Sequence, residues 1–77
     1  MSRLRLIDAK TMEKLLYKIG FAKVRQKGSH VAFRHNDGRY TTVPFHGSKD
    51  LPRSLIRAIL NEINTSVDEY NEMLDNL

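Results

Sequence analysis

The stretch AKVRQKGSHVAFRHNDGRYTTVP, residues 22–44, decides the fold because two turn signals separate three segments of alternating polarity. Gly28-Ser29 is typical of a two-residue hairpin turn, and Asn36-Asp37-Gly38 marks a second turn. Strands are therefore expected at residues 21–27, 30–35 and 39–44. Successive strands joined by such short turns pair as an antiparallel meander.

Alternation assigns the side chains of these strands to two faces of the sheet. In the first strand, Ala22 and Val24 are expected to face the core. Its other face is expected to carry one row of basic side chains: Lys23, Arg25 and Lys27. In the second strand, Val31 and Phe33 share one face. The opposite face of that strand carries His30, Ala32 and Arg34.

Apolar residues at helical spacing flank the sheet on both sides. Before it, an i, i+3, i+4, i+7 pattern predicts a helix over residues 9–19, with Asp8 as its N-cap. Gly20 then ends this helix in the left-handed conformation. After the sheet, a wide apolar stripe predicts a second helix, which has Pro52 in its first turn and Asn64 as a left-handed cap.

A capping box at Ser66-Val67-Asp68-Glu69 begins a short last helix. The expected fold is therefore α+β with the order α-β-β-β-α(-α), a three-stranded antiparallel sheet and the helices on one face. Its α-β-β-β-α part is the arrangement of a double-stranded-RNA-binding domain, although a fold alone does not define a function. We expect a single domain over residues 1–77, with a core at about 8–70. Residues 1–7 form a short extension that is either frayed or part of a partner interface.

Length and composition restrict the kind of site. A chain of 77 residues buries little surface, so we expect a shallow site and no cofactor. The absence of cysteine excludes disulfides and thiolate metal sites. No apolar run is long enough for a signal peptide or a membrane span, which predicts a cytoplasmic protein with no membrane partner.

The charge is distributed unevenly along the chain. All 13 Lys and Arg lie between Arg3 and Arg57, together with only four acids. From Ala58 onward there are five acids and no Lys or Arg. The basic part suits a polyanionic partner such as RNA, and composition is equally compatible with a lysine-rich surface that has no such partner.

His30 is the best candidate for a catalytic residue. Histidine titrates near neutral pH, so it can transfer the protons that RNA cleavage by transesterification requires. His30 follows a tight turn at the start of a strand, and we expect Lys27 and Arg34 to supply positive charge close to it. The alternative is a solvated strand histidine without a role. Ser29 and His30 form a further, weaker candidate for a nucleophile pair.

The other histidines and the glycine have more than one interpretation. His46 is a second acid or base, a phosphate contact, or a side chain that hydrogen-bonds a loop carbonyl, and we favour the last. His35 lies on the opposite strand face from His30 and is expected to be structural or incidental. The histidine spacings match no zinc signature, so no metal site is expected. Gly28 is better explained by the hairpin turn than by a phosphate-binding loop.

One part of the sequence resembles the HicA toxin family of type II toxin–antitoxin systems. The resemblance rests on the Gly-Ser-His element that ends at His30 and on Val-Pro-x-His, residues 43–46, framed by the two predicted helices. It extends from about Asp8 to Tyr70. Ser54 and Leu55 depart from it, since the family often has Gly-Thr there.

The resemblance implies a toxin that cleaves mRNA without a metal and arrests translation and growth. It places the family's catalytic histidine at His30, with Gly28 and Ser29 in the same motif. It also implies a HicB-type antitoxin that blocks this histidine. The basic side chains expected to bind RNA or stabilise charge are Lys23, Arg25, Lys27 and Arg34, and His46 is a possible accessory group. We expect the toxin alone to be a monomer.

Two other interpretations stay open. A non-catalytic RNA-binding module would bind duplex RNA with a steep salt dependence and without strand scission. Only Arg53 and Arg57 lie near the start of the second helix, where such duplex readers usually hold phosphates. The third interpretation is a protein-interaction module that uses its acidic tail and exposed sheet edge.

Overall fold

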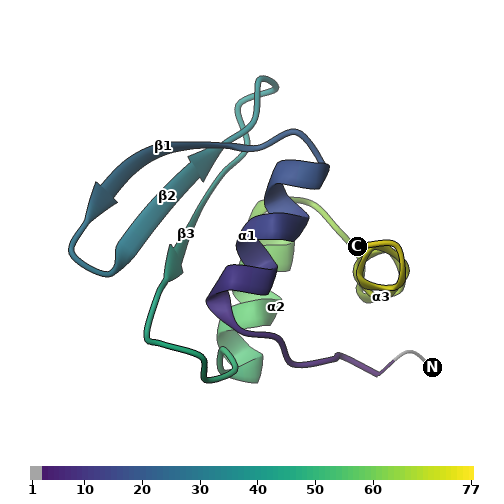
Figure 1. The fold of residues 1–77 in the computed structure, drawn as a ribbon. Helices are drawn as coiled ribbons and strands as arrows, with labels where there is room; N and C mark the ends of the chain where they lie inside the picture. Colours follow the sequence, from purple (N-terminus) through teal and green to yellow (C-terminus); the bar gives the residue numbers. More distant parts are fainter. Residues whose placement is uncertain (1–2) are drawn as a thin grey trace.

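The computed structural model describes residues 3–77, which form three helices and one three-stranded sheet (Figure 1). In chain order the elements are α1 (Ala9–Lys18), β1 (Ala22–Lys27), β2 (His30–Arg34), β3 (Tyr40–Pro44), α2 (Arg53–Glu62) and α3 (Val67–Asp75). The strands pair antiparallel in the order β1-β2-β3. The predicted α+β fold and its element order are confirmed.

Two helices cover one face of the sheet. α1 and α2 both contact β3, and α3 lies on the far side of these helices from the sheet (Figure 1). The core contains side chains with no exposed surface from α1, α2 and the sheet, and Tyr70 of α3 extends it beyond the two helices: Met12, Leu15, Leu16, Phe33, Val43, Ile56, Ile59, Ile63 and Tyr70. None of the helices within residues 3–77 is long and apolar enough to cross a membrane.

The predicted helix ends are confirmed by their hydrogen bonds and dihedral angles. Asp8 accepts a hydrogen bond from the backbone N–H of Thr11 at 2.9 Å, and hydrogen bonds from Thr11 lower the pKa of Asp8. Asn64 ends α2 with a φ of 55°, in the left-handed region. Ser66 and Glu69 form both hydrogen bonds of the capping box that begins α3. These local signals set the ends of the helices.

We call the face of the sheet opposite α1 and α2 the open face. Val31 and Phe33 of β2 are buried in the core, so the alternate side chains of β2 point to the open face. Their directly paired neighbours on β1 and β3 point the same way. The open face therefore carries Ala22, Arg25, Lys27, His30, Ala32, Arg34, Tyr40, Thr42 and Pro44.

The expectation that Ala22 and Val24 face the core is wrong. Every residue of β1 is exposed, and Val24 keeps 51% of its surface accessible. β1 is an edge strand, and α1 and α2 make their main sheet contacts with β3. The helix layer therefore does not cover β1.

The single basic row predicted along β1 is also wrong, because a β-bulge interrupts the strand. Lys23 pairs with Phe33 and Arg25 pairs with Ala32, which leaves Val24 as an extra residue. After an extra residue, the strand's side chains point to the face opposite to the one that uninterrupted alternation would give them. Lys23 thus shares the helix side with Phe33, and its Nζ lies 3.9 Å from Oε2 of Glu13.

Residues 3–7 are an integral part of the fold, so the expectation of a frayed extension is wrong for them. Leu4 and Ile7 are buried in the core, and the backbone N–H of Leu51 donates to the Ile7 carbonyl at 2.8 Å. Arg5 forms a 2.9 Å ion pair with Asp75 of α3. Met1 and Ser2, which the same expectation covered, lie outside the described residues.

We predict that Leu4→Ala lowers the free energy of unfolding by about 2 to 5 kcal/mol, the usual cost of truncating a buried leucine. Leu4 is 4% exposed, whereas the nearby Leu6 is 42% exposed and provides a matched control. Leu6→Ala is expected to change stability by about 0.5 kcal/mol or less. Urea unfolding of both variants measures this, and equal losses would contradict the packing of residues 3–7.

Candidate active site on the open sheet face

His30 begins β2, the central strand, and is exposed on the open face. Its backbone is fixed on both sides, because it pairs with Lys27 of β1 and with Pro44 of β3. The next residue, Val31, is buried in the core. A rigid backbone thus holds a histidine ring that solvent and a large ligand can reach.

The predicted two-residue turn is confirmed, since Lys27 and His30 pair directly around Gly28-Ser29. Gly28 has a φ of 59°, a conformation that side-chain-bearing residues rarely adopt. The Ser29 carbonyl accepts a hydrogen bond from the backbone N–H of Phe45 at 2.7 Å. This bond extends the β2–β3 pairing beyond Pro44 and draws the following segment toward the turn.

The same bond brings His46 to His30. The two ring centroids are 6.4 Å apart, the ring planes are nearly perpendicular at 85°, and both residues are exposed. The loop-anchoring role favoured from the sequence stays a prediction, whereas the structure places the ring of His46 beside His30. Two histidines therefore stand next to each other on the same edge of the open face.

The cations on the open face lie in an order that the sequence did not predict. Lys27 is the direct cross-strand neighbour of His30, and Arg25 stands one open-face position further along β1. Arg34 is four residues from His30 along β2, which corresponds to about 13 Å of strand. Its guanidinium carbon lies 5.7 Å from the ring centroid of Tyr40. The expectation that Arg34 supplies charge close to His30 is wrong.

The open face is positively charged along its whole length. β1, β2 and β3 contain four Lys and Arg and no Asp or Glu. Lys23 is the one of these four that lies on the helix side, near Glu13. Arg25, Lys27 and Arg34 are therefore available to an anion on the open face.

His35 has a structural position. Its ring packs edge-on against Phe21 with centroids 5.3 Å apart, and its Nδ1 accepts the backbone N–H of Asp37 at 3.1 Å. A Cβ added at Gly20 would lie 2.9 Å from Nε2 of this ring. Gly20 therefore makes room for His35 as well as ending α1.

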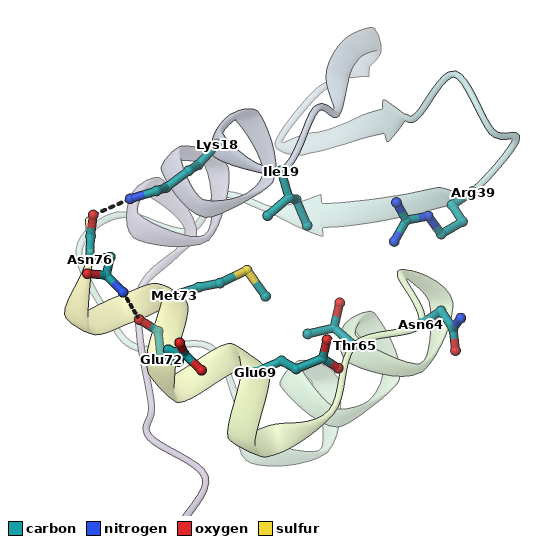
Figure 2. A pocket seen from close by; sticks show the side chains of 9 residues that line it. All are labelled: Lys18, Ile19, Arg39, Asn64, Thr65, Glu69, Glu72, Met73 and Asn76. Atoms are coloured by element: carbon teal, nitrogen blue, oxygen red, sulfur yellow. Dashed lines mark hydrogen bonds between the residues drawn. The ribbon is translucent and has the colours of Figure 1, made fainter.

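A cavity of about 410 Å³ lies on the helical side of the molecule and is separate from the histidine pair (Figure 2). It is lined by Lys18, Ile19, Arg39, Asn64, Thr65, Glu69, Glu72, Met73 and Asn76. Two cations and two carboxylates balance each other there, and Lys18 is bound to the Asn76 carbonyl. Nowhere in residues 3–77 do three His, Asp or Glu side chains gather closely enough to hold a metal ion.

Tyr40 also lies on the open face and was not among the candidate site residues expected from the sequence. It is 42% exposed and pairs directly with Arg34. The signal that could have found it is the register across the Asn36-Asp37-Gly38 turn, which sets Tyr40 opposite Arg34. Alternation from the buried Val43 also gives it an outward direction.

The fold and the site together define a small α+β domain with a basic, histidine-bearing sheet face. A family model described as the HicA toxin of bacterial toxin–antitoxin systems matches residues 9–64, from the start of α1 to the end of α2. The chain belongs to the HicA toxin family, as the resemblance predicted. It is thus the toxin of a toxin–antitoxin system, and family membership implies a cognate antitoxin as its partner. No curated protein matches the chain.

Proposed function

We propose that this toxin is an endoribonuclease that cleaves mRNA and arrests translation, with His30 as its catalytic residue. The observation that carries the proposal is the exposed His30 on the open face, with Lys27 directly opposite and the ring of His46 6.4 Å away. Proton transfer and positive charge are the two requirements of phosphodiester transesterification. Because the proposed substrate is mRNA, we also propose that the protein acts in the cytoplasm.

In the proposed reaction, a neutral His30 ring accepts the proton of a ribose 2′-hydroxyl while its oxygen attacks the adjacent phosphorus. The bond from phosphorus to the 5′-oxygen of the next nucleotide breaks, and a protonated His46 donates a proton to that oxygen. The products are a 2′,3′-cyclic phosphate and a 5′-hydroxyl end. Each histidine gains or loses one proton, and these two proton transfers need no metal ion.

Lys27 stabilises the phosphorane in this scheme, because it stands directly across the ladder from His30. Arg25 holds a neighbouring phosphate further along the same strand. Ser29 and Gly28 act through the turn that positions both histidines, rather than as a nucleophile or a phosphate cradle. Lys23 has no part in it, because it lies on the helix side.

The open face suits single-stranded or locally open RNA, whose sugar and phosphate groups it can meet without enclosure. A duplex reader with the same fold would need free cations at the start of α2. There, Arg53 donates to the Leu4 carbonyl at 3.1 Å and is committed to the fold. We also propose that the toxin alone is a monomer and that a HicB-type antitoxin covers His30.

We predict that His30→Ala lowers the rate of RNA cleavage at least about a hundredfold, because it removes the general base. The assay uses a long single-stranded RNA in excess EDTA, with circular dichroism to establish that the variant is folded. His35→Ala is the matched histidine control, expected to lose stability and keep cleavage when folded. Equal cleavage by the parent and His30→Ala would refute the assignment.

We predict that His46→Ala alters the pH dependence as well as the rate of cleavage. A base that must be neutral and an acid that must be protonated give a bell-shaped profile, with a rise from the base and a fall from the acid. Removal of the acid should abolish the fall at high pH and retain the rise. A slower reaction with an unchanged bell would show that His46 contributes only binding or position.

We predict that Lys27→Ala slows cleavage about tenfold or more, since it removes the cation opposite His30. Lys23→Ala changes the net charge by the same amount on the same strand, and it is expected to have little effect. The two rates are compared at low and moderate salt, because added salt screens exposed charges. Equal losses in the two variants would mean that net charge, and not position, matters.

A further inference from the structure

The end of the open face away from His30 carries a second group of side chains that the proposed reaction does not use. We propose that Tyr40 and Arg34 form a subsite that holds one nucleobase of a single-stranded RNA, a few nucleotides from the cleaved phosphate. The inference rests on the proposed function for the presence of RNA, and its test reads binding instead of cleavage.

The two side chains lie against each other on the open face as an exposed pair, which we call the platform. Tyr40 and Arg34 are directly paired across β3 and β2, and the guanidinium carbon lies 5.7 Å from the tyrosine ring centroid. Both residues are exposed, so a further ring can approach them. Single-stranded RNA is usually held by its bases, which stack on aromatic rings and on the planes of arginine side chains.

Between this platform and His30 the open-face residues of β2 and β3 are small. Ala32 is the open-face residue of β2 between His30 and Arg34, and Thr42 is its partner on β3. The two ends are separated by about 13 Å, the length of four residues of strand. Ala32 is only 5% exposed, so a sugar–phosphate chain that crosses the sheet here would contact its exposed partners Thr42 and Arg25.

The positions of the cations also support this subsite. Arg25 and Lys27 lie along β1, beside the path from His30 to Arg34. Phosphates can therefore follow β1 while a base turns toward Tyr40 on β3. Arg34 stands too far from His30 to stabilise the reacting phosphate. In this proposal it holds a base at the other end of the open face.

A cavity of about 440 Å³ adjoins the platform on the side of β1. It is lined by Ala22, Val24, Arg34, His35, Asn36 and Gly38. Apolar groups suit the flat faces of a base, and a side-chain amide such as that of Asn36 can hydrogen-bond its edge. Val24, which is half-exposed on an edge strand, thus lines this cavity, and we propose that the cavity receives a base beside the platform.

The test measures RNA binding by the full chain carrying His30→Ala, so that cleavage does not interfere. The probe is a fluorescent single-stranded oligoribonucleotide, and its Kd is obtained from anisotropy at several salt concentrations. Adding Tyr40→Ala should weaken binding about 5- to 150-fold, the range for loss of one base–aromatic stack. Tyr40→Phe should keep the affinity. Tyr17→Ala is the matched control, because Tyr17 is 46% exposed on α1, on the helix-covered side of the sheet.

The salt dependence separates stacking from charge. Tyr40→Ala and Arg34→Lys should weaken binding and leave the slope of log Kd against log salt unchanged, because neither alters the number of cations. Arg25→Ala should lower the slope by about 0.7, the value for one phosphate contact on a single strand. A change of slope with Tyr40→Ala would contradict stacking as its role.

An abasic scan locates the base. Removing one base at a time from the probe should reveal one position whose loss weakens binding, and that penalty should vanish with Tyr40→Ala. Unchanged affinity in Tyr40→Ala, the same penalties in both proteins, or no RNA binding at all would each overturn the subsite. Cleavage by the protein that retains His30 is scored separately, so the subsite can fail while the nuclease stands.

Discussion

The burial of Val31 and Phe33 against α1 and α2 is the constraint on which the rest of the structure depends. Both side chains of β2 are inside the core, so the register of the central strand cannot slip by one residue without exposing them. The same register fixes His30 and Arg34 on the open face. It also selects their partners, Lys27 and Tyr40. The candidate site is therefore a consequence of how the core packs, although none of its side chains belongs to the core.

The two segments outside the family match stabilise each other. Residues 3–8 and α3 lie before and after residues 9–64, and they meet through the Arg5–Asp75 ion pair and a hydrogen bond from Asn71 to the Arg3 carbonyl at 2.8 Å. Tyr70 of α3 is buried and its hydroxyl donates to the Arg5 carbonyl. Burial raises the pKa of Tyr70 to about 12, so the phenol stays neutral and keeps donating across the physiological range. Residues 3–8 and α3 therefore pack against the helices on the side away from the sheet and stabilise them there.

The sequence predicted the elements and missed the faces of one strand. The turns, the caps at Asp8 and Ser66 and the order of elements follow from local chemistry, which a single sequence contains. The bulge at Val24 could not be predicted, because it depends on which residues of β2 stand opposite and on the absence of a helix over β1. Its consequence reaches the site, since it separates Lys23 from Arg25 and Lys27. The proximity of His46 to His30 was missed for a similar reason, because a backbone hydrogen bond between Ser29 and Phe45 creates it.

The openness of the site has a mechanistic consequence for the proposed nuclease. His30 and His46 are both exposed, so the protein does not gain rate by excluding water from an enclosed pocket. Orientation must then come from binding the RNA along the face, at positions remote from the reacting phosphate. A basic, acid-free sheet face supplies such positions, and it makes binding and catalysis depend on the same surface. A partner that covers this one face would block both at once, without entering a pocket or changing the fold.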